Sequence, residues 1–596
     1  MFNSRNPAFR YPTGAVADCL PVHFRIDMPR DLRCSAARLL VRHDEDGTVD
    51  RYDMFWCGMN GDNHEWWECH YAAQKPGLYF YHFEVDTWRG TLHLCRSFGS
   101  EGILLESARD DWQLTVYDRA FHTPAWLLGG VMYQIFPDRF FASGTPKKGV
   151  PKDRKLHTAW EGQPDWEPDE QGRITNTDYF GGDLRGITEK LDYLKTLGVT
   201  CIYLNPIFES HSNHRYDTAN YEKIDPLLGN EADFKALCTE AKKRGIRVML
   251  DGVFSHTGSD SVYFNREGRY KTPGAYNSKE SPYYPWYTFH NWPDEYDCWW
   301  NFLTLPNVKE TEPTYNTYIN GPDGIVRRWL KAGASGWRLD VADELPDAFL
   351  DNLRVAVKTQ DPDALVLGEV WEDASTKSAY NHRRKYLLGE QLDTRTHLSR
   401  ERRRVGLQRL KRAALLQFTL PGVPCIYYGD EAGMEGYKDP FNRGPYPWGQ
   451  EDKDLVLWYA QLGQLRRELS CLKQGQFSPL QADGHCMAYV REDAVDALLV
   501  AVNAGDEPRT LYLPEQWRTA TALFGEEPDR NSAVTLPARG CAVLTYQKHP
   551  SPAGPYALGK PETPEEAIES IKDKIIENMD QKPELKKELL DFLKKI

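Results

Sequence analysis

From about residue 125 the chain alternates short β-branched or aromatic runs with stretches of helical pattern, and this rhythm constrains the fold more than any other feature. Helical stretches such as ITEKLDYLKTLG and EADFKALCTEAKKRG end in glycine, as is typical of a helix C-terminus. Repeated strand–helix alternation predicts parallel βαβ units, and nearly continuous apolar strands fit a barrel wrapped by helices. We therefore expect a central (β/α)8 barrel of the TIM type with strands at VMYQIF (131–136), CIYLNPIF (201–208), VMLDGVF (248–254), GWRLDV (336–341), LVLGEV (365–370) and CIYYGDE (425–431).

Short alternating segments precede and follow this central part. Near the N-terminus they include HFRIDM, LYFYHFEV and WQLTVYD, separated by turn-forming DEDG, NGDN and KPG, a pattern that predicts a β-sandwich. Near the C-terminus CMAYVRE, ALLVAVN and CAVLTYQ predict a second β domain. The expected domains are a β-sandwich at 1–122, the barrel at 123–464 with an insertion at about 257–320, a β domain at 465–548, and a linker with a helical hairpin at 549–596.

The last segment differs in composition from the rest of the chain. Residues 560–596 contain no Arg, Gly, Trp, Tyr or Cys, and their apolar residues keep helical spacing on both sides of Pro583. This pattern predicts an amphipathic helical hairpin. The hairpin either packs on its own domain or serves as a self-association or partner module, and its composition is also consistent with a fused segment.

Bulk properties exclude several classes of protein. The net charge of −14 and pI of about 5.7 argue against nucleic acid or anionic membranes as partners. The first residues lack the apolar core of a signal peptide, and no run reaches the ~18 apolar residues that span a bilayer. The twelve cysteines are scattered without a C-x-x-C pair, which favours reduced thiols over a metal site and predicts a cytoplasmic protein.

Polar side chains stand at the ends of the predicted barrel strands, where such folds carry their function. Asp340 follows Arg338 on one face of the fourth strand, because residues i and i+2 of a strand share a face. Glu369 ends the next strand and is followed by Trp371. Two acids on adjacent strands suit glycoside hydrolysis. Aromatic residues, which make up 12% of the chain, have flat faces that suit the apolar faces of sugar rings.

The two acids have different neighbours, and this predicts different roles. Arg338 should lower the pKa of Asp340 and keep it ionised as a nucleophile. Glu369 follows LVLG, an apolar setting that should favour the protonated acid needed to donate to a leaving oxygen. The alternative is an ion-pair network that only closes the top of the barrel.

Several ordered motifs resemble glycoside hydrolase family 13, the α-amylase family. DGVFSH, GWRLDVADE and GEVW are similar to its first three signature regions, and GVPCIYYGDEAGMEG to its eighth strand. SNHRYDTANYEKIDPLLG and LPNVK resemble its neopullulanase, cyclomaltodextrinase and amylopullulanase branch. The resemblance covers about 125 to 548, and the N-terminal domain resembles that branch's starch-module-like domain.

The resemblance implies a retaining hydrolase of α-glucans, with α-1,4 or α-1,6 linkages of maltooligosaccharides, cyclodextrins or pullulan as substrates. Asp340 would form the covalent glycosyl-enzyme and Glu369 would act as acid and then base. The remaining sugar contacts would be made by Arg338, His256, Tyr216 and Trp371. Ser255 stands where many members have an asparagine tied to structural calcium, which puts calcium in doubt, and no cofactor is expected to be required. A homodimer could form through the N-terminal domain or the hairpin.

One part of the family pattern is missing. The family has a third carboxylate, an Asp after His at the end of the seventh strand, but the only His-Asp pair here is His43-Asp44 in the N-terminal domain. About 55 residues separate Glu369 from the last strand, whereas three βα units need roughly 90. The intervening text looks helical almost throughout, so strands six and seven are expected to be absent, with a join near 392–397. Asp393 is the candidate substitute, and the alternative function is a catalytically impaired glucan-binding or scaffold protein.

Overall fold

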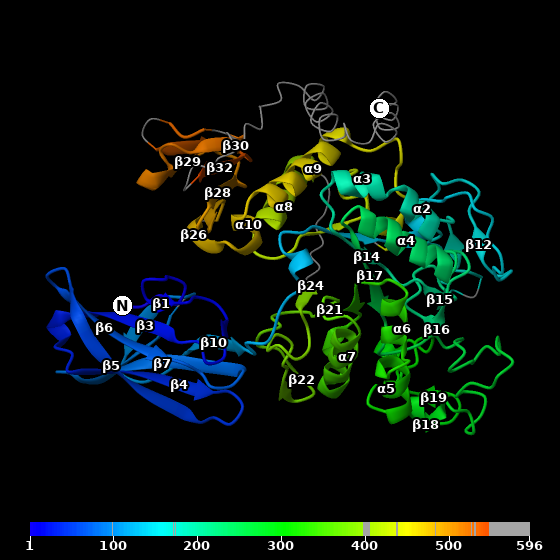
Figure 1. Ribbon diagram of the computed structural model, residues 1–596, viewed down its shortest axis with the longest axis horizontal. Helices are drawn as coiled ribbons and strands as arrows, with labels where there is room; N and C mark the ends of the chain where they lie inside the picture. The colour runs from blue at the N-terminus through cyan, green and yellow to red at the C-terminus, as the bar shows by residue number, and fades with distance from the viewer. Residues whose placement is uncertain are drawn as a thin grey trace.

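The computed structural model has an antiparallel β domain, a central parallel sheet with helices, and a second antiparallel β domain, in chain order (Figure 1). It describes residues 1–547 except Phe98, Gln171, Arg173, 397–405, Tyr437, Lys438, Asp483, Glu526, Arg530 and Asn531. The predicted hairpin at 549–596 therefore lies outside the described residues.

The N-terminal domain is built on alternation of buried and partly exposed residues. In β3 (Val22–Pro29) every second side chain is buried, as the sequence pattern predicts. The long β5 (Val49–Asn60) pairs with β4 through its first half and with β6 through its second half, so it joins two sheet layers around one core. The other strands are β1 (Arg10–Tyr11), β2 (Val16–Ala17), β4 (Ala36–His43), β6 (His64–Tyr71), β7 (Gly77–Thr87), β8 (Gly90–Arg96), β9 (Gly102–Leu105) and β10 (Trp112–Tyr117).

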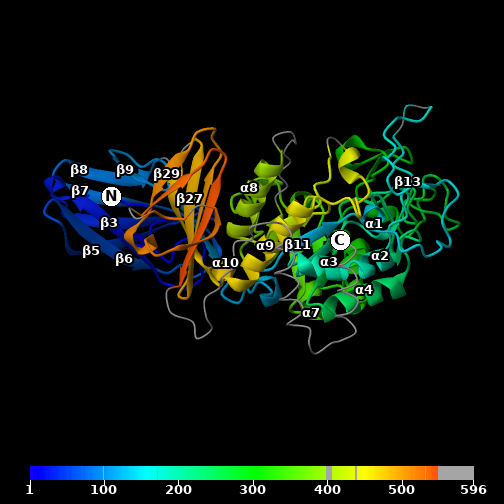
Figure 2. The same ribbon diagram turned by 90° about the horizontal axis from the view of Figure 1, so that it is seen from above.

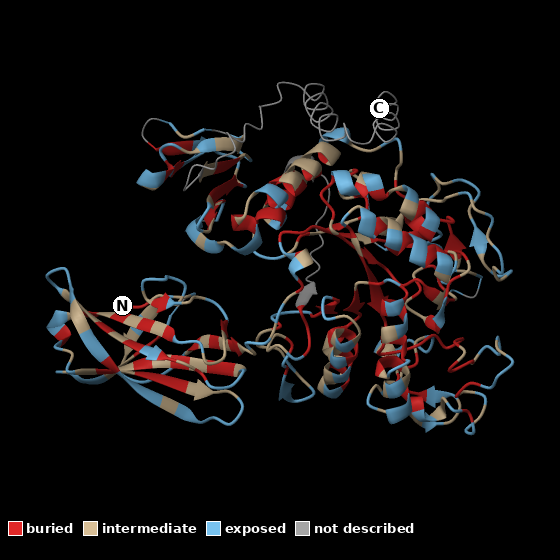
Figure 3. Ribbon diagram, in the orientation of Figure 1, coloured by how far each residue is buried: buried red, intermediate tan, exposed pale blue. Residues whose placement is uncertain are grey.

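The central sheet has the strand order β24-β21-β20-β17-β14-β11-β25, and every neighbouring pair is parallel. Within the described residues β24 and β25 form its two edges. The strands of this sheet are β11 (Met132–Ile135), β14 (Cys201–Leu204), β17 (Arg247–Gly252), β20 (Gly336–Leu339), β21 (Leu365–Glu369), β24 (Thr394–Thr396) and β25 (Cys425–Tyr427). Strands β14, β20 and β21 are buried throughout, and Figure 3 shows the buried interior of the sheet.

Strand β24 corrects the expectation that no strand lies between β21 and the last strand. It pairs in parallel with β21 and fills the position after the fifth strand. Three residues are too few to give a recognisable strand pattern, since typical strands have five or six. The stretch between β21 and β24 is not helical either, because it contains β22 (Ser378–Ala379), β23 (His382–Arg383) and turns.

Helices cover the central sheet and follow local sequence signals. Asn230 caps α4 (Glu231–Lys243): its side chain accepts from the N–H of Asp233, whose carboxylate accepts from the N–H of Asn230. The helix buries Phe234 and Leu237 toward the sheet. The other helices of this part are α1 (Pro137–Phe140), α2 (Leu184–Glu189), α3 (Leu191–Thr196), α5 (Pro313–Asn320), α6 (Ile325–Lys331), α7 (Asp347–Gln360), α8 (Gly406–Thr419), α9 (Lys453–Glu468) and α10 (Cys471–Gln474).

The C-terminal domain is an antiparallel sheet of order β26-β27-β28-β32-β30 with the separate pair β29 and β31. Helices α8 and α9 lie between this domain and the central sheet (Figure 1, Figure 2). No helix among the described residues has the length and apolar character needed to cross a bilayer. The strands are β26 (Gln476–Ala482), β27 (Cys486–Glu492), β28 (Asp496–Asn503), β29 (Arg509–Tyr512), β30 (Thr521–Gly525), β31 (Ala533–Leu536) and β32 (Cys541–Gln547).

Candidate active site

Three carboxylates meet where three adjacent strands of the central sheet end. In the parallel ladders Asp251 of β17 lies beside Arg338 of β20, and Leu339 lies beside Gly368. Asp340 directly follows β20, and Glu369 is the last residue of β21. The carboxyl ends of the strands therefore bring Asp251, Asp340 and Glu369 to one edge, and the sequence predicts this position for Asp340 and Glu369.

The guanidinium of Arg338 joins these carboxylates. Its Nη1 donates to Asp251 Oδ1 at 2.8 Å and to Asp340 Oδ1 at 2.7 Å, and its Nη2 donates to Glu369 Oε2. All four side chains are buried, with Arg338 only 5% exposed. Buried charges are stable only when paired and hydrogen-bonded, and one arginine here serves three acids.

Burial outweighs Arg338 in setting the pKa of Asp340. Desolvation raises the pKa of Asp340 to about 7, aided by the charges of Asp251 and Glu369, although Arg338 acts in the opposite direction. Burial also raises the pKa of Asp251. Arg338 does act to lower the pKa of Asp340, as the sequence predicts, but the net shift of the pKa is upward. A short sequence shows the charged partner but not the loss of water.

Glu369 does not have the apolar setting expected from its sequence neighbours. Its Oε2 accepts from Arg338 and from the backbone N–H of Val341 at 3.1 Å, and its Oε1 accepts from Trp371 Nε1 at 3.2 Å. Val341 has a φ of 42°, a left-handed conformation that costs a β-branched residue roughly 1–2 kcal/mol. This left-handed conformation turns the chain directly after Asp340, where the backbone N–H of Val341 donates to Glu369.

Two tyrosine hydroxyls donate hydrogen bonds to Asp251. The hydroxyl of Tyr216 donates to Asp251 Oδ2 at 3.2 Å, and that of Tyr203 donates to the same oxygen at 2.6 Å. Asn205 in turn donates to the hydroxyl of Tyr216 at 3.1 Å. The sequence pattern missed Tyr203, because in the fully buried run of β14 a functional tyrosine has the same signature as a core residue.

His256 lies beside this network and has a free nitrogen. Its Nδ1 is 3.0 Å from the hydroxyl of Ser255, while its buried Nε2 has no hydrogen-bond partner among the described residues. Burial lowers the pKa of His256 to about 4, so the ring is neutral at pH 7. The structure thus brings five of the six predicted site residues into one hydrogen-bonded network and places His256 next to it.

The candidate substitute for the third carboxylate lies at the wrong end of the sheet. Asp393 accepts from the N–H of Val366, near the start of β21, whereas Glu369 is at its end. Its carboxylate is also paired with Arg354 at 2.9 Å and Lys358 at 2.8 Å. Asp393 is therefore a buried ion-pair partner of α7, remote from Asp340.

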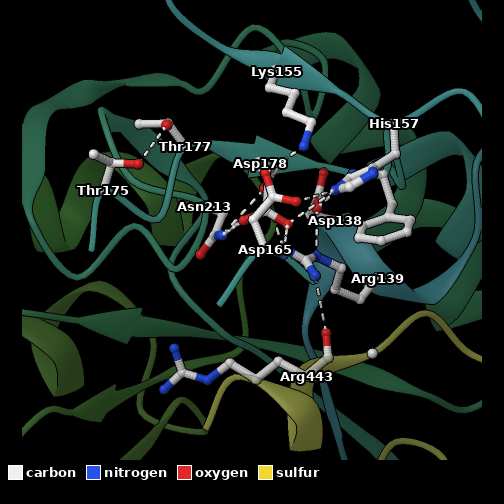
Figure 4. A network of polar contacts seen from close by, with 12 residues as sticks. Asp138, Arg139, Lys155, His157, Asp165, Thr175, Thr177, Asp178, Asn213 and Arg443 are labelled. Atoms are coloured by element: carbon white, nitrogen blue, oxygen red, sulfur yellow. Dashed lines mark hydrogen bonds and ion pairs between the residues drawn. The ribbon is translucent and has the colours of Figure 1, made fainter. Parts of the chain in front are cut away.

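One cluster among the described residues has the composition of a metal site. His157, Asp165 and Asp178 point toward one another in Figure 4, and their ligand atoms lie within 4.8 Å. Lys155 already pairs with Asp165 at 2.5 Å, and Arg139 pairs with Asp178 at 3.4 Å. Because cations of the chain neutralise this cluster, it carries no metal assignment, and it is separate from the Arg338 network.

Comparisons with known proteins agree with this architecture. Residues 134–404 match the model of the alpha amylase catalytic domain. The chain is 33% identical to neopullulanase 2 of Thermoactinomyces vulgaris, covering 70% of this chain and 77% of that protein. It is 34% identical to an amylopullulanase of Thermoanaerobacter thermohydrosulfuricus over 82% of this chain. The chain spans 31–49% of the length of the amylopullulanases it matches. A solved cyclomaltodextrinase superposes with a TM-score of 0.65 at 26% identity, covering 91% of this chain and 99% of that one.

Proposed function

Since this chain belongs to the α-amylase family of glycoside hydrolases, we propose that it is a retaining glycosidase of α-glucans in which Asp340 and Glu369 carry the reaction. The observation that supports this most is the shared guanidinium of Arg338, which holds both carboxylates at the ends of adjacent strands. A buried acid pair at this edge of the sheet suits attack on one side of a glycosidic bond and protonation on the other.

In the proposed mechanism the ionised Asp340 attacks the anomeric carbon and forms a glycosyl-enzyme. Glu369 gives its proton to the leaving oxygen and then takes a proton from the water that releases the sugar. Burial raises the pKa of Asp340, and Arg338 acts in the opposite direction by stabilising the anion of Asp340.

Tyr216, His256 and Trp371 are proposed to bind the sugar. The free Nε2 of His256 is a hydrogen-bonding group suited to a sugar hydroxyl. Trp371 is 48% exposed, and its indole N–H donates a hydrogen bond to Glu369. Its flat ring is therefore available to contact a sugar on the side where the leaving group departs. The ring of Tyr216 is fixed by Asp251 and Asn205. Substrates proposed for this site are maltooligosaccharides, cyclodextrins and pullulan.

A second candidate function is glucan binding without turnover. It is favoured because neither residue considered for the family's third carboxylate lies beside Asp340: Asp393 lies at the far end of β21, and Asp44 pairs with Arg383 at the sandwich. The family uses such a group to hold the distorted sugar. On this alternative the aromatic residues and Arg338 still bind oligosaccharide.

The test is release of reducing ends from maltohexaose, cyclodextrin and pullulan. We expect Asp340→Asn to lower turnover by about 10⁴-fold or more, because the covalent step is lost. The control is Asp361→Asn, which removes a half-buried carboxylate at the end of α7 and should leave turnover unchanged. Turnover that survives in Asp340→Asn would reject the assignment of Asp340 as the nucleophile. Absence of turnover in the unmodified protein, with oligosaccharide binding retained, would establish the second function.

A further inference from the structure

The turn after β21 is fixed through the backbone of one residue. Trp371 lies outside the regular strands and helices, two positions after the proposed acid Glu369. Its N–H donates to Asp343 Oδ2 at 3.0 Å, and its carbonyl accepts from Lys377 Nζ at 3.3 Å. Lys377 Nζ also donates to Asp343 Oδ2 at 2.9 Å, so the three residues form a closed ring of hydrogen bonds. Backbone groups outside a strand ladder need such side-chain partners to be held in place.

This ring joins the two turns that carry the proposed catalytic carboxylates. Asp343 belongs to the 3-10 turn η5 (Ala342–Glu344), which begins two residues after Asp340. Trp371 follows Glu369 by two residues as well. A shift of either turn stretches the hydrogen bond between Asp343 and Trp371, so the ring resists a change in the distance between the two carboxylates.

The ion pair within the ring is sheltered from water. The side chains of Lys377 and Asp343 are only 14% and 11% exposed, and a charge-assisted hydrogen bond in such a place is screened little by salt. Desolvation alone lowers the pKa of Lys377, but its contacts with Asp343 and Glu372 raise the net pKa above the ordinary value. Glu372 has a φ of 67°, a left-handed conformation that turns the chain directly after Trp371.

The ring can do what Arg338 cannot. A guanidinium attracts ionised carboxylates, and this attraction weakens when Glu369 carries the proton that it must donate. The hydrogen bonds to the backbone of Trp371 do not depend on the protonation of Glu369. A backbone tether is therefore suited to hold a neutral acid in place.

We propose that Lys377 and Asp343 are positioning residues that hold the acid Glu369 at its working distance from Asp340. This inference deepens the proposed function and rests on it. Retaining hydrolysis needs the two carboxyl groups about 5–5.5 Å apart. A displacement of the turn after β21 by about 1 Å moves the acid away from the leaving oxygen.

The kinetic experiment compares two substrates whose leaving groups need different amounts of protonation. The glucose of maltotriose leaves only when its oxygen is protonated, whereas 4-nitrophenolate leaves 4-nitrophenyl α-maltoside with little help from an acid. The quantity measured is kcat/KM, which reports formation of the glycosyl-enzyme. We expect Lys377→Met to lower kcat/KM about 100-fold for maltotriose and less than about threefold for 4-nitrophenyl α-maltoside.

Two further variants test the ion pair itself. Lys377→Arg keeps a charged donor and should recover most of the maltotriose activity. Asp343→Asn removes the ion pair from the other side and should show the same preference for the nitrophenyl substrate as Lys377→Met. Circular dichroism melting confirms that each variant is folded.

Amide hydrogen exchange of the free protein gives a second measurement that does not depend on turnover. Peptides that cover residues 370–376 report the N–H of Trp371 when they are analysed by mass spectrometry. We expect exchange in these peptides to be about tenfold faster in Lys377→Met than in the unmodified protein.

The matched control is Lys358→Met, at the other end of β21. Lys358 Nζ also pairs with one carboxylate, that of Asp393 at 2.8 Å, and donates to one carbonyl, that of Ala364 at 2.7 Å. Its removal should change neither the ratio of the two kcat/KM values nor exchange at 370–376.

An equal fall of both kcat/KM values in Lys377→Met, or unchanged exchange at 370–376 in that folded variant, would overturn the positioning role. The same would follow if Lys358→Met matched Lys377→Met in both measurements. No turnover of either substrate by the unmodified protein would reject the proposed function instead. Exchange alone would then decide whether Lys377 holds the turn at Trp371.

Discussion

At the scale of single residues, the central feature is one arginine that serves three buried acids. Arg338 contacts Asp251, Asp340 and Glu369, and all three are at most 7% exposed. Removing one partner of a buried pair costs roughly 3–5 kcal/mol because the other charge is left uncompensated. The cluster therefore resists change, and the pKa values of Asp251 and Asp340 are set jointly by burial and by the arginine.

The raised pKa of Asp340 predicts a pH-dependent stability. The folded pKa of about 7 lies above the ordinary 3.8, so raising the pH from about 4 to 7 removes a proton from the unfolded chain first and destabilises the fold. The full effect corresponds to roughly 4 kcal/mol. The amide introduced by Asp340→Asn does not ionise. We therefore expect the difference in melting temperature, Asp340→Asn minus the unmodified protein, to be more positive at pH 8 than at pH 5.

The measurement is thermal unfolding of both proteins at pH 5 and pH 8, followed by circular dichroism. Asp361→Asn serves again as the control, because Asp361 lies at the end of α7 and does not belong to the Arg338 cluster. A melting-temperature difference for Asp340→Asn that stays constant between the two pH values would contradict the raised pKa.

At the scale of elements, the segment after β21 is fixed by contacts on both sides. Arg384 is buried and donates to Asp347 Oδ1 at 3.0 Å, to the carbonyl of Asp343 at 3.0 Å and to the carbonyl of Leu345. Its neighbour Arg383 is more exposed and pairs with Asp44 of the N-terminal sandwich at 2.9 Å. The two adjacent arginines therefore have opposite environments.

These environments predict different effects on stability. Arg384→Ala removes three hydrogen bonds of a buried guanidinium, including the one to the buried carbonyl of Leu345, and should destabilise the protein by about 3 kcal/mol. Arg383→Ala removes a surface ion pair and should cost about 0–1 kcal/mol. Urea unfolding of the two variants compares them directly. Equal destabilisation would show that the buried contacts of Arg384 contribute no more than the surface pair.

At the scale of the whole molecule, the N-terminal sandwich contacts the segment that carries these arginines. Gln113 donates to Ser375 Oγ at 3.1 Å, and the N–H of Asp118 donates to the carbonyl of Leu388 at 3.0 Å. The segment lies directly after Glu369 and Trp371, so the sandwich and the candidate site share a structural element. Polar interdomain contacts of this kind are typical of domains that move relative to one another.

The charge balance of the His157, Asp165 and Asp178 cluster predicts that this cluster needs no bound ion. The His157, Asp165 and Asp178 cluster is neutralised by Lys155 and Arg139. We expect a chelator to change the melting temperature by less than about 1 °C. An ion held at 100 times its Kd stabilises by about 2.7 kcal/mol, so its removal would be easily seen. A large fall in melting temperature that added Ca²⁺ reverses would contradict this prediction.

The sequence by itself determined the order of domains, most strands of the central sheet and the six candidate residues. Strand periodicity, glycine at helix ends and the Arg-x-Asp spacing are local properties, and local properties can be read from adjacent residues. The family resemblance rested on the same motifs and is confirmed by the relatives. The domain boundaries and the residue roles stay predictions.

Only the tertiary structure decided the rest, because it depends on which residues meet across the fold. β24 is a strand solely because it pairs with β21. Asp393 lies away from the site because it is beside Val366, near the start of β21, whereas the site is at the end of that strand. Burial, which no single segment specifies, raises the pKa of Asp340 despite Arg338. The ring of Trp300 meets the ring of Trp371, which is 71 positions away in the sequence, through packing alone.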